Sequence, residues 1–151
     1  MTYDVSTRAG RIEPERSLND DAPAASAANH KMVLVVDDSA AVRHELRQVL
    51  SAAEFEVIEA PDGEQAIRMI QTHPHLALVI CDVNMPVRNG LEVLEHVKAD
   101  AVTAAIRVVM LTTEGRPELI HQAKRAGASG WIIKPFKADL LVAAVNKLTA
   151  S

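Results

Sequence analysis

Acidic, hydroxyl and lysine side chains close four of the five short apolar runs in this 151-residue sequence. Asp37 and Asp38 follow the first run, Asp82 the third, Thr112 the fourth and Lys134 the fifth. Carboxylates gathered at one place repel each other unless a cation joins them or their pKa values rise. Oxygen ligands suit Mg²⁺, with Mn²⁺ as the alternative. An Asp carboxylate can also attack phosphorus, and lysine and threonine can donate to phosphoryl oxygens, so this set predicts phosphoryl transfer.

The elements that must position these groups alternate along the chain from residue 32 onward. Apolar runs occupy residues 32–36, 55–59, 76–81, 106–111 and 130–133, and apolar residues at helical spacing follow each run. The central runs are almost continuously apolar, as strands buried on both faces are. Five β-α repeats predict an α/β fold, a doubly wound parallel five-stranded sheet with helices on both faces. Ligands of such sheets bind beyond the carboxyl ends of the strands, where the four groups would meet.

Capping signals mark where the predicted helices begin and end. Ser39 is suited to cap the first helix, and Asn89 stands at a helix start or turn. Pro117 lies near the first turn of the fourth helix, and Gly127 is its predicted stop.

Composition limits the classes of function. Residues 1–30 have almost no large apolar side chains and are predicted to form a flexible tail before a domain at 31–151. Aromatic residues are only 3% of the chain, so the core must be aliphatic. The net charge of −4 gives no reason to expect nucleic acid, and no run approaches the roughly 18 apolar residues of a membrane span. The single cysteine, Cys81, rules out an internal disulfide and fits a cytoplasmic location.

Four motifs in order resemble the response-regulator receiver family, in particular its single-domain chemotaxis regulators. They are Val33-Leu34-Val35-Val36-Asp37-Asp38-Ser39, Cys81-Asp82-Val83-Asn84-Met85-Pro86, Leu111-Thr112-Thr113-Glu114 and Lys134-Pro135-Phe136. The resemblance covers residues 32–149. It implies a flavodoxin-like (βα)5 fold with strand order 2-1-3-4-5, the order of the chemotaxis regulator in this family.

The resemblance also implies a role for each acidic residue. Asp82 would accept a phosphoryl group from the phosphohistidine of a sensor histidine kinase or a histidine phosphotransfer protein. Asp38, Asp82 and the backbone carbonyl of Asn84 would bind Mg²⁺ directly, and Asp37 would act mainly through a metal-bound water. The protein would be a signalling phosphoacceptor that catalyses only its own phosphorylation and dephosphorylation, and no enzyme in the usual sense.

A switch is implied by the same resemblance. Lys134, expected to precede a cis peptide bond to Pro135, would contact the phosphoryl group, and Thr112 would move to hydrogen-bond it. Trp131 stands where Tyr or Phe is usual, and its larger ring is harder to rotate in a close-packed interior. The output surface for a downstream protein would comprise the fourth helix, the fifth strand and the fifth helix, including Arg116, Ile120, Lys124, Trp131 and Lys137.

Asn84 and Glu114 occupy the positions that should tune the lifetime of the signal. Each lies two residues after a site residue, Asp82 and Thr112 respectively. The chemotaxis regulator carries the same pair and is short-lived within the family. We therefore predict a phosphoryl lifetime of minutes or less rather than hours.

Several interpretations of the function remain open at this point. The chain ends soon after the fifth predicted helix, so we expect a stand-alone receiver, monomeric or weakly dimeric, that acts by binding partners. A phosphorelay intermediate and a receiver taken from a larger regulator are the alternatives. A phosphatase with an Asp nucleophile, as in haloacid dehalogenase-like enzymes, is remote. Such enzymes carry Asp-x-Asp after the first strand, whereas Asp37 and Asp38 are adjacent.

Overall fold

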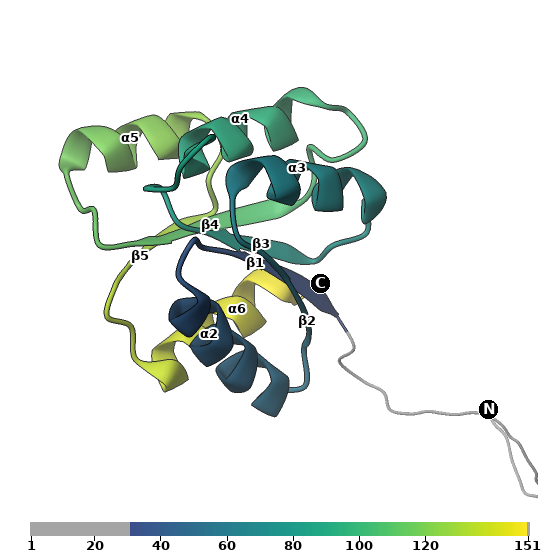
Figure 1. Cartoon of the computed structure of the whole chain (residues 1–151), viewed down its shortest axis with the longest axis vertical. Coiled ribbons are helices and arrows are strands. Elements are labelled where there is room, and N and C mark those ends of the chain that lie inside the picture. The colour runs from purple at the N-terminus through teal and green to yellow at the C-terminus, as the bar shows by residue number, and fades with distance from the viewer. Residues whose placement is uncertain (1–30, 151) are drawn as a thin grey trace, which may run out of the picture. The chain divides into compact units, whose positions relative to one another are not determined.

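The computed structural model describes residues 31–150 as alternating strands and helices (Figure 1). The predicted tail at 1–30 lies outside the described residues. None of the helices in the described part is long and apolar enough to cross a membrane. The elements are β1 Met32–Val36, α2 Ala40–Ala52, β2 Glu56–Ala60, α3 Gly63–Thr72, β3 Leu78–Cys81, α4 Gly90–Ala99, β4 Arg107–Thr112, α5 Pro117–Arg125, β5 Gly130–Ile133 and α6 Ala138–Thr149.

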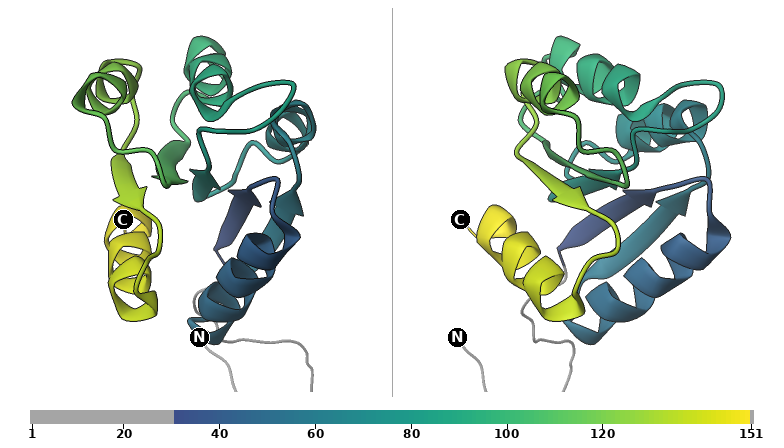
Figure 2. Two further views of the ribbon diagram at one scale, coloured as in Figure 1. Left: turned by 60° about the vertical axis from the view of Figure 1, so that its left-hand side comes forward. Right: turned by 90° about the vertical axis from the view of Figure 1, so that its left-hand side faces the viewer.

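The five strands form one parallel sheet in the order β2-β1-β3-β4-β5, which confirms the predicted topology. Helices α3, α4 and α5 cover one face, and α2 and α6 cover the other (Figures 1 and 2). All four residues of the central strand β3 are buried, as its unbroken apolar run predicted. Two aliphatic cores, one on each side of the sheet, therefore hold the strands in place.

The predicted capping residues are found where the helices begin and end. The Ser39 hydroxyl accepts a hydrogen bond from the Val42 N–H, and Asn89 forms a reciprocal capping box with Glu92. Pro117 opens α5, and Gly127 follows its end with a φ of 105°, a left-handed conformation that glycine adopts without steric cost.

Three strand boundaries differ slightly from the prediction. β2 is shifted by one residue to Glu56–Ala60, β3 begins at Leu78 rather than at residue 76, and β4 is shifted by one residue to Arg107–Thr112. Hydrophobicity did not locate these ends because the apolar residues Phe55, Leu76 and Ile106 are buried without belonging to the strands. Thr112 is thus the last residue of β4, and its side chain is fully buried.

Candidate functional site

The carboxylates of Asp37, Asp38 and Asp82 meet beyond the carboxyl ends of β1 and β3. One oxygen from each lies within 4.8 Å of the other two. Strand pairing explains the meeting: Val36 is level with Cys81, and the Asp82 N–H donates to the Val36 carbonyl at 3.0 Å. Asp37 and Asp82 are buried, and Asp38 is exposed. Two sheltered carboxylates and one open to solvent are a donor set that fits a hard divalent cation keeping some of its waters.

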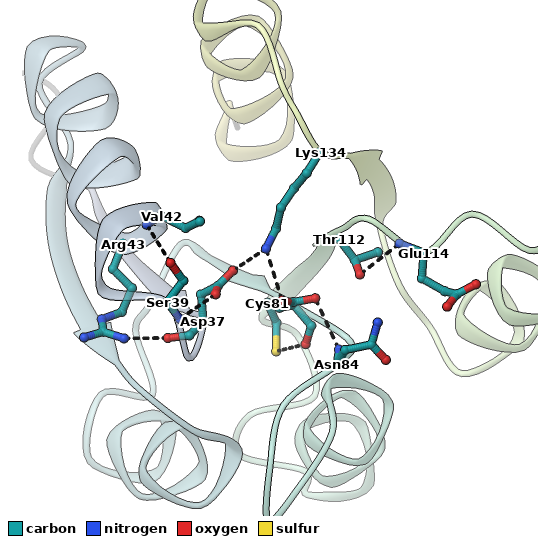
Figure 3. A network of polar contacts seen from close by, with 10 residues as sticks. Asp37, Ser39, Val42, Arg43, Cys81, Asn84, Thr112, Glu114 and Lys134 are labelled. Carbon is teal, nitrogen blue, oxygen red and sulfur yellow. Dashed lines mark hydrogen bonds and ion pairs between the residues drawn. The ribbon is translucent and has the colours of Figure 1, made fainter.

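Lys134, directly after β5, bridges two of these carboxylates (Figure 3). Its Nζ lies 2.7 Å from Asp37 Oδ2 and 3.1 Å from Asp82 Oδ2, and 15% of its side chain is exposed. Burial alone would lower the pKa of Lys134, but the hydrogen bonds to the two carboxylates outweigh it and raise that pKa. The ammonium therefore stays charged at neutral pH. The peptide bond to Pro135 is cis, as predicted.

The Asp37 carboxylate is the most firmly held of the acidic groups. Besides Lys134, the Ser39 N–H donates to its Oδ1 at 2.9 Å. Burial raises the pKa of Asp37, and the nearby Asp82 carboxylate adds to the rise, while the bonds from Lys134 and Ser39 oppose it. Ionisation of Asp37 is thus less favourable in the folded protein than in the unfolded chain, and a cation beside its carboxylate would favour the ionised form.

Two site residues escaped the sequence analysis, Arg43 and Glu59. Arg43 Nη1 donates to the backbone carbonyl of Asp37 at 2.6 Å, and its Nε pairs with Glu59 Oε1 at 3.1 Å. Arg43 therefore fastens helix α2 and strand β2 to the backbone of the acidic cluster. A single arginine on a helix and a glutamate at a strand end form no motif, so the only signal was the position of Arg43 one turn after the cap Ser39.

The loop after Asp82 turns back on the Asp82 carboxylate. The Asn84 N–H donates to Asp82 Oδ1 at 3.2 Å. At Gly90, where the loop enters α4, an added Cβ would come within 2.2 Å of the Asp82 carbonyl oxygen, so only glycine fits there. Asn84 is exposed and lies beside Asp82.

Thr112, Glu114 and Trp131 form a second chain of contacts. The Glu114 N–H donates to the Thr112 hydroxyl oxygen at 3.2 Å, and the Trp131 ring N–H donates to the Glu114 carbonyl at 2.9 Å. Glu114 is the residue predicted to tune the signal lifetime, and Trp131 is the aromatic residue of the predicted switch. The geometry joins them, because the backbone of Glu114 lies between the Thr112 hydroxyl and the indole.

The predicted output surface contains a groove between α5 and β5. Of the five residues predicted there, three line the groove and Arg116 and Lys137 do not. Arg116 instead pairs with Glu114, with Nε 2.8 Å from Oε2. The lining residues are Ile120, Ala123, Lys124, Ala128, Ser129, Gly130 and Trp131.

Known proteins share this sequence pattern and this fold. The family model for the response regulator receiver domain matches residues 33–146. The chemotaxis protein CheY of Bacillus subtilis is 35% identical over 116 residues, which cover 76% of this chain and 94% of that protein. The crystallised chemotaxis protein CheY4 of Vibrio cholerae superposes with a TM-score of 0.74 at 36% identity, covering 78% of this chain and 98% of that one.

A further similar structure carries ligands. It is the complex of CheX and CheY from Borrelia burgdorferi with BeF3 and Mg²⁺. This chain superposes on it with a TM-score of 0.75 at 28% identity, covering 80% of this chain and 90% of that one.

Proposed function

This chain belongs to the response regulator receiver domain family, and on that premise we propose that Asp82 accepts a phosphoryl group from a phosphohistidine in a Mg²⁺-dependent reaction. The observation that carries the proposal is the arrangement of three carboxylates within 4.8 Å and a lysine that bridges two of them. Asp82 is the acidic residue that shares contacts with both the lysine and the Asn84 loop. It is therefore positioned by groups on two sides, as an in-line nucleophile must be.

Phosphoryl transfer to Asp82 would involve Lys134 and Thr112 as donors to the phosphoryl oxygens. An oxygen of the Asp82 carboxylate forms the bond to phosphorus, and the bond from phosphorus to the donor imidazole nitrogen breaks, so the electron pair returns to the imidazole. Lys134 Nζ is placed to exchange its bond with Asp82 for one to a phosphoryl oxygen. The Thr112 hydroxyl accepts from the Glu114 N–H, which leaves its own proton available for another phosphoryl oxygen.

Mg²⁺ fits the donor set, with Asp38, Asp82 and the Asn84 carbonyl as direct ligands and Asp37 acting through water. When bound, it would neutralise charge on the phosphoryl oxygens. Asp38 suits a direct role because it is exposed and forms no salt bridge among residues 31–150. Mn²⁺ would satisfy the same oxygen ligands.

Hydrolysis of the acyl phosphate ends the signal. Water attacks phosphorus, the bond to the Asp82 oxygen breaks, and inorganic phosphate and the free carboxylate are released. The backbone N–H groups of Asn84 and Glu114 donate to Asp82 and to Thr112, so both residues lie next to the reacting groups. The lifetime of minutes or less stays a prediction from the resemblance of this pair of residues to the pair in the chemotaxis regulator. The protein would then be a switch that catalyses only its own two reactions.

The phosphorylated state would be read through the surface of α5, β5 and α6. Thr112 is linked to Trp131 through the backbone of Glu114. A movement of Thr112 toward a phosphoryl oxygen would therefore shift Trp131, which lines the groove between α5 and β5. We propose a cytoplasmic chemotaxis-type or stand-alone regulator with a downstream protein target. A phosphorelay intermediate remains the alternative for the same chemistry.

The direct test uses beryllofluoride, a phosphoryl mimic, with Mg²⁺. Trp131 is the only tryptophan in the chain, so its fluorescence should change on binding in the wild type and stay unchanged in Asp82→Ala. Glu95→Ala, which removes an exposed carboxylate of α4 outside the site, is the control and should still respond. A wild type that gives no response, or a response that Asp82→Ala retains, would contradict the proposal.

A further inference from the structure

The loop between Asp82 and α4 contains a strained turn. Val87 has a φ of +71°, and the Arg88 N–H donates to the Pro86 carbonyl at 2.8 Å, which closes a three-residue turn around Val87. A three-residue turn with positive φ at its centre is the strained form of the γ-turn. A β-branched residue is an outlier in this conformation, and such strain persists only where the surroundings impose it.

Packing of Val87 does not impose this conformation. Its side chain is 79% exposed, so apolar contacts cannot offset the strain. The restraint must come from the residues on either side of Val87. Arg88 is the neighbour with a long polar side chain that reaches another element.

Arg88 is held against helix α3 by both its backbone and its side chain. A Cβ added at Gly63 would lie 2.5 Å from the Arg88 carbonyl oxygen, so the start of α3 touches the loop backbone closely. Arg88 Nε lies 2.8 Å from Glu64 Oε1 in the first turn of α3. This hydrogen bond lowers the pKa of Glu64 and raises the pKa of Arg88.

The same loop carries the group that the site needs. Asn84 donates its N–H to the acceptor Asp82 and is the proposed carbonyl ligand of Mg²⁺. The strained turn begins two residues after Asn84. A loop released at Arg88 can relax its turn at Val87, and the relaxation would displace Asn84.

We propose that Arg88 is a positioning residue that fastens the acceptor loop to α3 through Glu64, keeps the turn at Val87 in its strained form and so holds Asn84 at the metal site. The inference rests on the proposed function, since it names a residue that supports the Mg²⁺ site of that function. It concerns a side chain that none of the four family motifs includes.

The chain supplies its own control for this role. Glu64 has a second arginine partner, Arg68, at 3.7 Å on its own helix, and that pair does not involve the loop. The experiment therefore compares Arg88→Ala with Arg68→Ala in the full chain. We expect Arg88→Ala to weaken Mg²⁺ binding about two- to fivefold, the range that an exposed ion pair supports, and Arg68→Ala to leave it unchanged. Mg²⁺ binding is measured from the Asn84 amide resonance during a titration.

A second readout needs no metal. In the metal-free protein, Arg88→Ala should speed amide hydrogen exchange in residues 83–89, and Arg68→Ala should not. Urea unfolding of each variant shows whether the fold is intact. If Arg88→Ala lowers Mg²⁺ affinity without faster exchange in this loop, or if Arg68→Ala has the same effect on affinity, the positioning role is wrong.

Removing the strain tests the link between Arg88 and Val87. Glycine accepts positive φ without cost, so in a Val87→Gly background the loop has less strain to release. Arg88→Ala should then change Mg²⁺ affinity by a smaller factor than in the wild type, a coupling that a double-mutant cycle measures. Equal factors in both backgrounds would overturn the proposal. The proposed function is tested by a different experiment. A wild type that takes no phosphoryl group from acetyl phosphate would refute that function, whatever the Arg88 variants show.

Discussion

The two halves of the site differ in how their side chains are held. On one side, the Asp37 carboxylate and carbonyl are bound by Lys134, Ser39 and Arg43, at 2.6–2.9 Å. On the other side, the Thr112 hydroxyl accepts one backbone N–H at 3.2 Å, and the Trp131 indole donates one bond. The first half fixes the charged groups that a cation or a phosphoryl group would meet under the proposed function. The second is linked by single bonds and can rearrange at lower cost, which suits a part that reports on the first.

The largest effect on this contrast should come from Lys134→Met. The substitution leaves Asp37 and Asp82 facing each other without their shared ammonium, and it removes the proposed donor to the phosphoryl group. We expect labelling by acetyl phosphate to slow by about a hundredfold, the scale for losing one preorganised donor. Lys137→Met, three residues further on and exposed, is the matched control. A slowing in both variants would show a general charge effect instead.

Removal of Arg43 tests whether the half of the site around Asp37 depends on the hydrogen bond from Arg43 to the Asp37 backbone carbonyl. Arg43→Ala loses the charged hydrogen bond to the Asp37 carbonyl, and we expect the free energy of unfolding to fall by about 1–2 kcal/mol. Arg47→Ala loses only a more exposed pair with Glu59 and should cost about 0.5 kcal/mol or less. Urea denaturation at neutral pH measures both. Equal losses would mean that the shared Glu59 contact, and not the Asp37 carbonyl, accounts for the effect.

The raised pKa of Asp37 predicts a pH dependence of stability. The folded protein holds this proton more tightly than the unfolded chain, whose Asp pKa is near 3.8. The contribution of Asp37 to the free energy of unfolding therefore falls as pH rises from about that value through the higher folded pKa. Asp37→Asn should remove this loss, so in metal-free buffer the variant gains stability over the wild type as pH rises to neutrality. If the gap between the two proteins does not widen with pH, the burial of an ionised Asp37 is not destabilising.

The smallest effect on stability and labelling should come from the half of the site formed by Thr112, Glu114 and Trp131. Trp131→Phe removes the indole donor to the Glu114 carbonyl while it keeps an aromatic ring in the groove, so we expect a loss of about 1 kcal/mol or less in unfolding free energy. Labelling of Asp82 by acetyl phosphate should stay within about twofold, because the lost bond does not touch the reacting groups. If Trp131→Phe slowed labelling as much as Lys134→Met, the two halves of the site would not differ in their effect on the reaction, and the comparison would be wrong.

The charged residues of the site could be predicted from the sequence more fully than the arginines that hold the surrounding backbone in place. Asp37, Asp82 and Lys134 were predictable because each directly follows an apolar strand, and parallel strands bring their carboxyl ends to one edge. Arg43 and Arg88 were not, because a long side chain reaches partners 16 and 24 residues away in directions that depend on the packed helices.

The strained turn at Val87 was hidden for a related reason. Valine carries no turn signal, so nothing in its residue type pointed to the positive φ that the loop adopts there. The link from Glu114 to Trp131 was missed in the same way, since the acceptor is a backbone carbonyl that any residue type supplies. The fold and the caps were readable because they depend on local pattern, and the tertiary side-chain bonds were not.

The most direct test of the central claim is to map the phosphoryl group after labelling with acetyl phosphate and Mg²⁺. Peptide mass spectrometry should place it on Asp82, and the label should be absent when Mg²⁺ is chelated. Label on Asp37 or Asp38 in the wild type, or labelling of Asp82 that proceeds equally well without a divalent cation, would contradict the account.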